Sequence, residues 1–431
     1  MSERNASSGE RIDSPVTAHE GQTSEGVKRR FSLLRRRTLT SGQHLYAQCA
    51  MHIVNDALFT GLTPLLPLIA LDLSLSYTQV GALRAAYSGT SAAFQIPAGI
   101  AAERFGEQLL LSLGTGSVGV GLAAMGLAGS FWFLFALCVL GGLGGNIQHP
   151  VATAVVSRIF DGPRRSSAIG ALNFAGDLGK VAAPLIVGAV ALYFGWRGAL
   201  MVLGTIGAAF ALFYLLIVPE PARPVATVGK DKALPVDVVS GWGIERRGLF
   251  AVLMIVGMLD AAARGAGLTF LPFVLIEKGI DPALMSLYFT VLFAAGAAGK
   301  FLCGPIADRY GTVTAVIVTE LITAVGFLAM LWVPAEGALI MLIPLGFALN
   351  GTSSILYAMV ASFVDVRRRA RGYGLFFTAT LLSSALAPVA YGALADFSGL
   401  VTTFVAMAIL TALIAPLAIV VRAGFRQHQT T

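Results

Sequence analysis

The sequence predicts an all-α polytopic membrane protein, with twelve transmembrane helices arranged as two pseudo-symmetric six-helix bundles. Of its 431 residues, 56% are hydrophobic and only 12% are charged, whereas a soluble domain carries about 25% charged residues. Apolar runs of about 20 residues recur between residues 45 and 421, and each can cross a hydrocarbon core of about 30 Å. The second half of the chain also repeats the first in register. These observations exclude a soluble globular protein.

The apolar runs and the breaks between them divide the chain into five regions. Residues 1–44 form a polar tail with a basic cluster, 45–218 a first bundle, 219–247 a polar linker that contains prolines, 248–421 a second bundle, and 422–431 a short tail. We expect the basic tail to meet an anionic membrane surface rather than a nucleic acid. The predicted spans are 45–71, 77–101, 108–128, 131–158, 166–191, 198–218, 248–275, 283–306, 312–333, 337–363, 372–395 and 400–421.

Lysine and arginine are distributed unevenly among the loops between these spans. With the N-terminus in the cytoplasm, the loops on that side contain most of them, including Arg104, Arg158 and Arg309, whereas the opposite loops contain only Arg197 and Lys278. Cytoplasmic loops of membrane proteins are enriched in positive charge. We therefore predict a multi-pass protein of the cytoplasmic membrane with both termini in the cytoplasm.

The two halves share residues at nearly constant spacing. "GIAAERFG" (99–106) and "GPIADRYG" (304–311) lie 205 residues apart, each after the second span of its half. At a spacing of 204, Asp56 corresponds to Asp260, Asn146 to Asn350, and "APLIVG" (183–188) to "APVAYG" (387–392). Matches in register over most of the chain indicate an internal duplication. Parallel six-span repeats imply two bundles that face each other across a site with alternating access.

This layout resembles the major facilitator superfamily over residues 45–421. The loop signature of that family, Gly-x-x-x-Asp-Arg-x-Gly, is complete in the second half as Gly304, Asp308, Arg309 and Gly311. In the first half it has Glu in place of Asp, and comprises Gly99, Glu103, Arg104 and Gly106. Glu107 and Gln108 then replace the basic residues of the family. The resemblance implies that these loops form a cytoplasmic gate, which latches in the outward-open state.

A second resemblance is narrower. "HIVNDAL" followed by "PLLPL", with "QHPVA" (148–152) in the fourth span, is similar to the fosmidomycin-resistance branch of the superfamily. The antiporter signature of span five is present in part: Gly179, Pro184 and Gly188 match, while Ala183 and Val187 replace glycines. This resemblance implies export by antiport.

Charged residues at membrane depth are the first candidates for a transport site, because charge there is costly and is rarely kept without a function. The acids are Asp56, Asp177, Asp260 and Glu320, and the bases are Arg84, Lys180, Arg264 and Lys300. Asp260 and Arg264 are four residues apart and Asp177 and Lys180 three apart, so each pair can meet on one helical face. Each pair is either a structural ion pair or part of the transport pathway. Lys300 and Glu320 lie nearer the cytoplasmic ends, where we expect packing or latch roles.

His52 and Asp56 share one face of the first span, with Asn55 beside them. Asp56 has no cation within one helical turn. Burial then favours its protonated form unless Arg84 or Lys180 reaches it across the cavity. A carboxyl that gains and loses a proton suits a proton-coupled carrier, and we expect Asp56 rather than Asp260 to have this role. His52 is either part of the same pathway or a packing residue.

The fourth span contains a second polar group, in which Asn146, Gln148 and His149 precede Pro150. Proline at depth frees a carbonyl and kinks the helix, so these side chains either satisfy the kink or contact the substrate. Arg84 lies in the outer third of span two, where it either reaches the membrane surface or faces the cavity. The repeat places Asn350 opposite Asn146 as a further candidate for the pathway.

We interpret the chain as a secondary active transporter, not an enzyme, that exports a small polar or amphipathic compound in exchange for protons. The alternatives are proton-coupled uptake of an anionic metabolite, for which Arg84, Arg264 and Lys180 offer cationic contacts, and a membrane sensor that does not transport. We expect no catalytic residues, metal or cofactor, because the chain has neither an H-E-x-x-H spacing nor a phosphate-binding Gly-x-x-x-x-Gly-Lys-Ser/Thr loop. The expected partners are substrate, protons and the lipid bilayer, without nucleic acid, and the expected state is a monomer.

Overall fold

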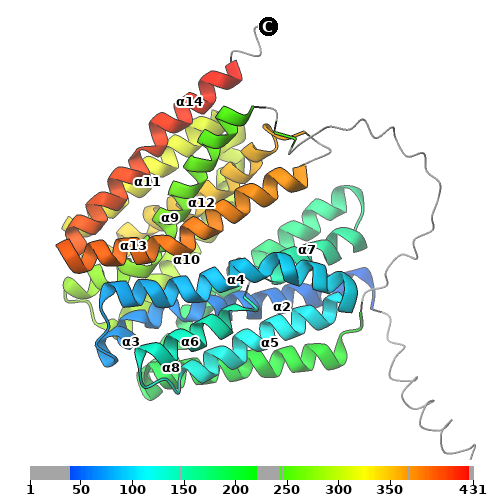
Figure 1. The fold of residues 1–431 in the computed structure, drawn as a ribbon, viewed down its shortest axis with the longest axis horizontal. Coiled ribbons are helices and arrows are strands. Elements are labelled where there is room, and N and C mark those ends of the chain that lie inside the picture. The colour runs from blue at the N-terminus through cyan, green and yellow to red at the C-terminus, as the bar shows by residue number, and fades with distance from the viewer. Residues whose placement is uncertain (1–38, 146, 221–242, 245, 366–368, 427–431) are drawn as a thin grey trace, which may run out of the picture.

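The computed structural model describes residues 39–145, 147–220, 243–244, 246–365 and 369–426. Helices make up nearly all of this part of the chain, and the only strand-like pairing within it is an isolated bridge between Ile244 and Val364. The helices form two bundles, one from each half, that lie against each other (Figure 1). Most of the tail predicted at 1–44 and of the linker predicted at 219–247 falls outside the described residues, as do half of the tail predicted at 422–431 and Asn146.

The first bundle begins with a span that two prolines divide. The Thr40 hydroxyl accepts a hydrogen bond from the Gln43 amide at the start of this span, at 3.3 Å. Pro64 and Pro67 stand at the beginnings of the next two helical segments, where the missing N–H of proline costs little. The elements of this bundle are α2 (Ser41–Gly61), η1 (Thr63–Leu65), α3 (Leu66–Asp72), α4 (Tyr77–Phe105), α5 (Glu107–Met125), α6 (Phe131–Gly142), α7 (Gln148–Ile159) and α8 (Gly162–Ile217).

The second bundle has the same plan. Its second and third helices meet at Gly311, with φ of 90°, as α4 and α5 meet at Gly106, with φ of 106°. These positive φ angles favour glycine, so the signature glycines make the tight turns between these helices. The elements are α9 (Arg247–Glu277), η2 (Pro282–Leu284), α10 (Met285–Tyr310), α11 (Thr312–Trp332), α12 (Ala335–Val360), α13 (Arg369–Ala412) and α14 (Ile414–Arg426).

The described residues contain twelve membrane spans. Eight helical stretches are long and apolar enough to cross a membrane. Two of these, α8 and α13 with its continuation α14, each contain two spans that meet at a left-handed glycine, Gly195 (φ 65°) or Gly399 (φ 83°). The helix α4 and the consecutive pair α6 and α7 form the other two spans. Gly195 and Gly399 are 204 residues apart, so the repeat extends to the backbone, and the predicted fold class is confirmed.

The fourth span differs from the prediction. We expected a kink at Pro150, but the chain leaves the helix earlier, after Gly142, and α7 begins again at Gln148. Pro150 therefore lies in the first turn of α7, where it interrupts no helical hydrogen bond. Gly142 packs against the carbonyl of Tyr87 in α4, and Gly144 against the carbonyl of Gly114 in α5. Any side chain at these positions would meet backbone, so the break allows two helices to approach closely.

The two bundles interlock at the end of the molecule where α4 begins. Gly81 of α4 packs directly against the Pro388 carbonyl of α13, and a Cβ at Gly392 of α13 would lie 2.5 Å from the Tyr77 carbonyl. The Asp396 carboxylate of α13 accepts hydrogen bonds from the amides of Tyr77 and Thr78, each at 2.8 Å. A carboxylate of one bundle thus caps the first turn of a helix in the other. We refer to this end as the closed end.

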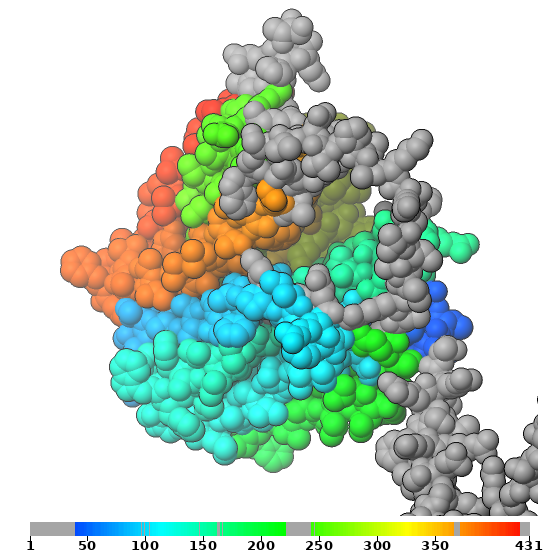
Figure 2. Space-filling view, turned by 45° about the vertical axis from the view of Figure 1, so that its right-hand side comes forward, coloured from blue at the N-terminus to red at the C-terminus, as the bar shows by residue number. Residues whose placement is uncertain are grey.

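The bundles diverge toward the opposite end, where the chain leaves α8 and later enters α9 (Figure 1). In the space-filling view, the surface is hollowed between the orange α13 and the blue-green segments of the first bundle (Figure 2). The molecule is therefore closed at one end and open at the other.

Candidate functional site

Six side chains from four helices form a group midway along the bundles, which we call the central cluster. Helix α2 contributes His52 and Asp56, α7 contributes His149, α8 contributes Asp177 and Lys180, and α10 contributes Lys300. The helical spacing of four residues in α2 and three in α8 places each local pair on one face. Because α10 belongs to the second bundle and the other helices to the first, the cluster spans both bundles.

Two lysines bridge the acids of the central cluster. The Lys180 Nζ lies 3.0 Å from Asp56 Oδ2 and 3.1 Å from Asp177 Oδ1, and the Lys300 Nζ lies 2.6 Å from the same Asp177 oxygen. The predicted Asp177–Lys180 pair is therefore present, and Lys180 also reaches Asp56, as one of the two sequence-based alternatives allowed. The contact between Lys300 and Asp177 joins the two bundles, and the sequence did not reveal this partner of Lys300.

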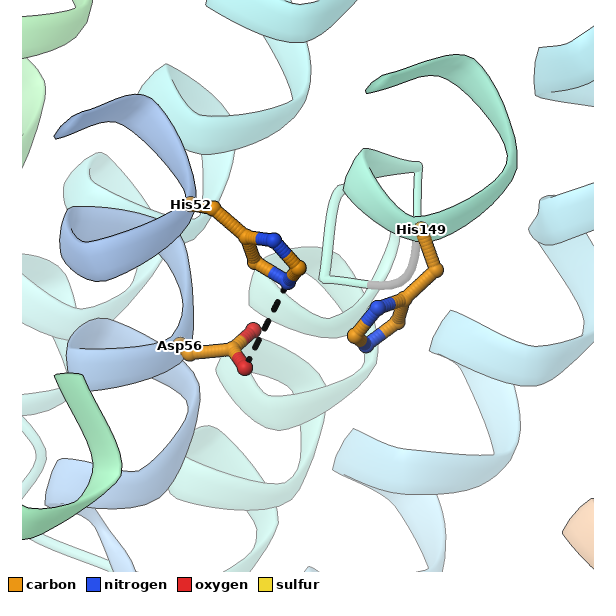
Figure 3. A group of neighbouring side chains, drawn as sticks. All are labelled: His52, Asp56 and His149. Carbon is orange, nitrogen blue, oxygen red and sulfur yellow. Dashed lines mark ion pairs between the residues drawn. The ribbon is translucent and has the colours of Figure 1, made fainter. Parts of the chain in front are cut away.

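The histidines stand on the other side of Asp56. The His52 Nε2 lies 3.6 Å from Asp56 Oδ2, and the ring centroids of His52 and His149 are 5.0 Å apart with their planes nearly perpendicular (Figure 3). Gly176 of α8 closes this side, because a Cβ there would lie 2.7 Å from Asp56 Oδ2 and 2.8 Å from His52 Nε2. The close approach of α8 fixes both side chains on α2.

His52, Asp56 and His149 could each offer one ligand atom to a metal, since these atoms lie within 4.8 Å of one another. Two imidazoles and a carboxylate suit a transition metal. The Lys180 ammonium, however, is already in contact with the Asp56 oxygen that faces His52. A metal would have to displace this cation, so we assign the group to charge pairing.

A second set of charged groups lies inside the second bundle. The Arg264 guanidinium donates a hydrogen bond to Asp260 Oδ2 at 3.0 Å, so the predicted pair is present. Glu320 of α11 lies within hydrogen-bonding reach of the Asp260 carboxyl and of Thr352 in α12. Only 1% of Glu320 and 4% of Asp260 is exposed. We call Asp260 and Glu320 the acid pair. Glu320 was expected near a cytoplasmic end, and its contact with Asp260 could not be read from the sequence.

Arg84 of α4 stands apart from both sets. Its guanidinium lies over the Phe59 ring, 5.8 Å from the centroid, and Phe59 stacks in turn on Tyr87. The neighbours of the guanidinium are Tyr87 and Cys138, and its Nη1 has no hydrogen-bond partner. Within the described part of the chain, no carboxylate pairs with Arg84. It is an uncompensated cation at membrane depth.

Three other predicted residues lie outside both sets. The Asn55 amide donates a hydrogen bond to the Thr115 hydroxyl of α5 at 3.1 Å, and the Asn350 amide donates to the Gly346 carbonyl of its own helix at 3.2 Å. Both therefore bind within a bundle. Gln148 is 1% exposed, and neither of its side-chain polar atoms has a partner among the described residues.

The predicted gate residues lie at the open end. Asp308 and Arg309 of α10 are exposed, and the Arg309 guanidinium lies over the neighbouring Tyr310 ring. Arg104 of α4 similarly lies over Phe105. Among the described side chains, which do not include that of Glu103, none of these groups forms an ion pair between the bundles.

The two residues that depart from the family signature have partners that the sequence analysis missed. The Glu107 carboxylate forms two hydrogen bonds with the Arg158 guanidinium, at 2.6 and 2.5 Å, and the Gln108 side chain donates to the Leu215 carbonyl at 2.8 Å. Glu220 accepts hydrogen bonds from the Glu107 and Gln108 amides at 2.7 and 3.0 Å. These contacts join α5 to α7 and to the end of α8 within the first bundle. The absence of the family's basic residues at positions 107 and 108 was the feature of the sequence that could have indicated these contacts.

Comparisons with known proteins agree with this architecture. A family model described as Major Facilitator Superfamily matches residues 49–273 and 253–429. A probable sulfoacetate transporter of Cupriavidus necator is 25% identical, over 85% of this chain and 90% of the relative. A hexuronate transporter of Bacillus subtilis is also 25% identical, over 77% and 83%.

More distant similarities bear on fold and branch. The crystal structure of a bacterial homologue of the human lysosomal transporter Spinster, in an inward-facing and unoccupied conformation, has a TM-score of 0.78. It is 19% identical and covers 90% of this chain and 98% of its own. The fosmidomycin resistance protein of Escherichia coli is 23% identical over 60% of this chain and 64% of the relative, so the narrower resemblance is only a distant one.

Proposed function

Because the chain belongs to the major facilitator superfamily of secondary transporters, we propose that it carries a small organic anion across the cytoplasmic membrane together with protons. The proposal thus favours the sequence-based alternative of an anionic substrate over the polar or amphipathic compound that we first inferred. The proposal combines an uncompensated cation in the first bundle with the chemistry of substrates named for relatives.

The observation that carries the proposal is Arg84. A buried guanidinium is normally paired, because removing its charge from water costs several kcal/mol or more. Arg84 has no carboxylate partner in the described chain, and a bound carboxylate or sulfonate would supply one with two parallel hydrogen bonds. Sulfoacetate and hexuronate, named for two relatives, are both small organic anions. The lysines of the central cluster are already neutralised by Asp56 and Asp177 and are less available.

The contacts between the bundles support alternating access. With the predicted orientation, the closed end faces outward and the structure is open to the cytoplasm. The opposite state requires Asp396 to leave the first turn of α4. The Lys300–Asp177 contact lies between the two ends and serves as the pivot. We assign the signature residues Asp308, Arg309, Glu103 and Arg104 to the gate that closes when this pivot turns.

The test is flux in proteoliposomes, with and without an imposed pH gradient, for sulfonates, sugar acids, simple carboxylates, phosphonates and cationic drugs. We expect saturable flux of at least one anion class and its acceleration by the gradient. Arg84→Gln should raise KM about tenfold or more, since a hydrogen bond to a charged group contributes about 1.5–3 kcal/mol. Arg84→Lys should retain part of the affinity, and exposed Arg422→Gln should behave as wild type. Flux of cations alone would contradict the proposal.

Export remains a second candidate, because the fosmidomycin resistance protein is a distant relative. The same vesicles distinguish the two directions. An exporter driven by exchange for protons accumulates substrate in vesicles that are acidic inside, whereas cotransport accumulates substrate in vesicles that are alkaline inside.

A further inference from the structure

We propose that Asp260 and Glu320 share one proton, and that this acid pair is the site at which proton movement is coupled to transport. The inference rests on the proposed function and adds the location of the coupling proton. It moves that proton from the first bundle, where the sequence placed it at Asp56, to the second.

The charges at membrane depth divide into three groups in the structure. The central cluster contains two acids and two lysines, and is therefore balanced. Arg84 stands alone and carries one positive charge in excess. The third group contains two carboxyls, Asp260 and Glu320, and one guanidinium, Arg264. With both carboxyls ionised, this third group has one negative charge in excess.

Among the described residues, no second cation pairs with the acid pair. On α9 the charged groups facing the pair are Asp260 itself and Arg264, which lies one helical turn away and bonds to Asp260 at 3.0 Å. Helix α11 contributes Glu320, and α12 contributes the neutral Thr352 and Tyr357. One Glu320 oxygen has no hydrogen-bond partner in the described structure. A single guanidinium therefore serves two nearly inaccessible carboxyls.

Two carboxylates in hydrogen-bonding reach of each other cannot both ionise in a buried site without a strong penalty. A single shared proton removes the repulsion and supplies the donor for the contact between them, as in other paired acids. The Glu320 carboxyl then donates to Asp260, and Asp260 keeps its ion pair with Arg264. This arrangement leaves the group neutral and satisfies the contacts that the structure shows.

Asp56 has no excess negative charge for a proton to neutralise. Its contact with Lys180 at 3.0 Å balances its charge, which removes the reason for which the sequence assigned the exchanging proton to it. We therefore assign the exchanging proton to Asp260 rather than to Asp56, which is the reverse of the sequence-based expectation. Asp56 keeps a stable ion pair, and Asp260 shares its only cation with a second acid.

This division of charge gives a simple coupling rule. A substrate monoanion neutralises Arg84 in the first bundle, and one proton neutralises the acid pair in the second. When either is missing, the closed state contains an uncompensated charge, which is costly at membrane depth. Two forms carry no net charge. One holds both the anion and the proton. The other holds neither, and the positive charge of Arg84 balances the negative charge of the acid pair. Closure with only one of the two bound is therefore disfavoured, whereas the open state can hold the proton alone.

The test compares Glu320→Gln, which mimics the protonated acid, with exposed Glu336→Gln as the control. We expect Glu320→Gln to lose at least about nine-tenths of its gradient-driven accumulation while it retains substrate exchange at about half the wild-type rate or more. Asp260→Asn should also lose accumulation, because Arg264 can then pair with Glu320 without a proton. Accumulation by Glu320→Gln with the wild-type proton dependence would overturn the assignment.

Infrared spectroscopy of the purified protein at neutral pH gives a readout that needs no substrate. We expect a carboxylic-acid carbonyl band, sensitive to exchange in D₂O, that is absent in Glu320→Gln and in Asp260→Asn and present in Glu336→Gln. Persistence of the band in both variants of the acid pair would overturn the proton assignment. If wild type carries no anion but shows this band, the proposed function fails while the shared proton stands. If wild type carries an anion and the band is absent, the shared proton is ruled out while the proposed function stands.

Discussion

Lys180 connects two acids that come from different helices. Its ammonium contacts Asp56 of α2 and Asp177 of its own helix α8, and Asp177 also contacts Lys300 of α10. Such a chain of alternating charges is more rigid than one ion pair, because moving any member leaves another uncompensated. A change in the relative position of the bundles must therefore act on this chain.

Gly176 offers a way to disturb the central cluster without removing a charge. In Gly176→Ala the new Cβ would lie 2.7 Å from Asp56 Oδ2 and 2.8 Å from His52 Nε2, so Asp56 must shift from Lys180. Overpacking of this kind costs about 1–3 kcal/mol. We expect at least about a tenfold loss in the initial rate of transport. Flux assays should show Gly170→Ala, at an open position of the same helix, within about twofold of wild type; equal rates for the two variants would contradict the role of the cluster.

The site was predictable only where contacts are local. Asp177–Lys180 and Asp260–Arg264 follow from helical spacing alone, because three or four residues place two side chains on one face. The Lys300–Asp177 contact joins residues 123 apart, and Glu320 meets Asp260 only because α11 packs beside α9. Such contacts depend on helix rotation and tilt, which a single sequence does not specify. The contact of Lys180 with Asp56, which the sequence left open as an alternative, depends on the same tertiary packing.

At the scale of elements, α4 and α13 form the main contact between the bundles at the closed end. Small residues allow their backbones to touch, as is common where membrane helices pack closely. Gly81 faces the Pro388 carbonyl, and Gly392 faces the Tyr77 carbonyl. The contact is reversible in principle because it depends on packing and on one carboxylate cap, with no covalent link.

Gly81→Ala should open this contact. Its Cβ would meet the Pro388 carbonyl, which is backbone and cannot rotate away. Ser286 is buried in the first turn of α10 and packs against Gly188 of the first bundle. We expect the closed end to loosen, so that a thiol introduced at Ser286 reacts about tenfold faster in detergent solution. The measurement uses a background in which Cys49, Cys138 and Cys303 are replaced by alanine.

The control for that experiment is Gly89→Ala, on the same helix. Its Cβ would lie 3.7 Å from the Ala385 Cβ, an ordinary van der Waals distance. Labelling at Ser286 should remain at the background rate in this variant. Equal acceleration in both variants would indicate general destabilisation of α4 rather than opening of the closed end.

Element boundaries show which backbone features can be read from composition. The signature glycines Gly106 and Gly311, which the sequence placed in the loops after the second span of each half, both adopt positive φ. The sequence analysis expected the fourth span to be interrupted at Pro150, whereas the chain leaves the helix after Gly142, in the run of glycines before that proline. Proline breaks a helix only where it removes an internal hydrogen bond, whereas Gly142 and Gly144 pack directly against neighbouring backbones.

At the scale of the whole molecule, the apolar run length and the internal repeat were sufficient to predict the class of fold. Both depend on physical constraints that every span must meet: a fixed membrane thickness and satisfied backbone groups. The family resemblance is confirmed by the match over most of the chain. Which end is open is a property of one conformation, and composition holds no information about it.

The predicted orientation can be tested on intact cells. In the alanine background, a cysteine at Asp281, between α9 and η2, should react with a membrane-impermeant thiol reagent added outside. A cysteine at Ala233 should react only after the cells are permeabilised, because the Lys and Arg distribution places 219–247 inside. Mass-shift assays quantify both. The opposite pattern would invert the molecule and make the closed end cytoplasmic.

The closed end has very short connections. Successive spans are joined there by residues 73–76, 126–130, 278–281 and 333–334, and by the single reversals at Gly195 and Gly399. An antibody or a protease that approaches this face would meet helix ends and almost no flexible peptide. With this end outside the cell, we expect it to offer few sites for antibody binding or surface proteolysis. An epitope for detection would have to be inserted within one of these connections, and 126–130, the longest of them, is the position at which an insertion should be tolerated best.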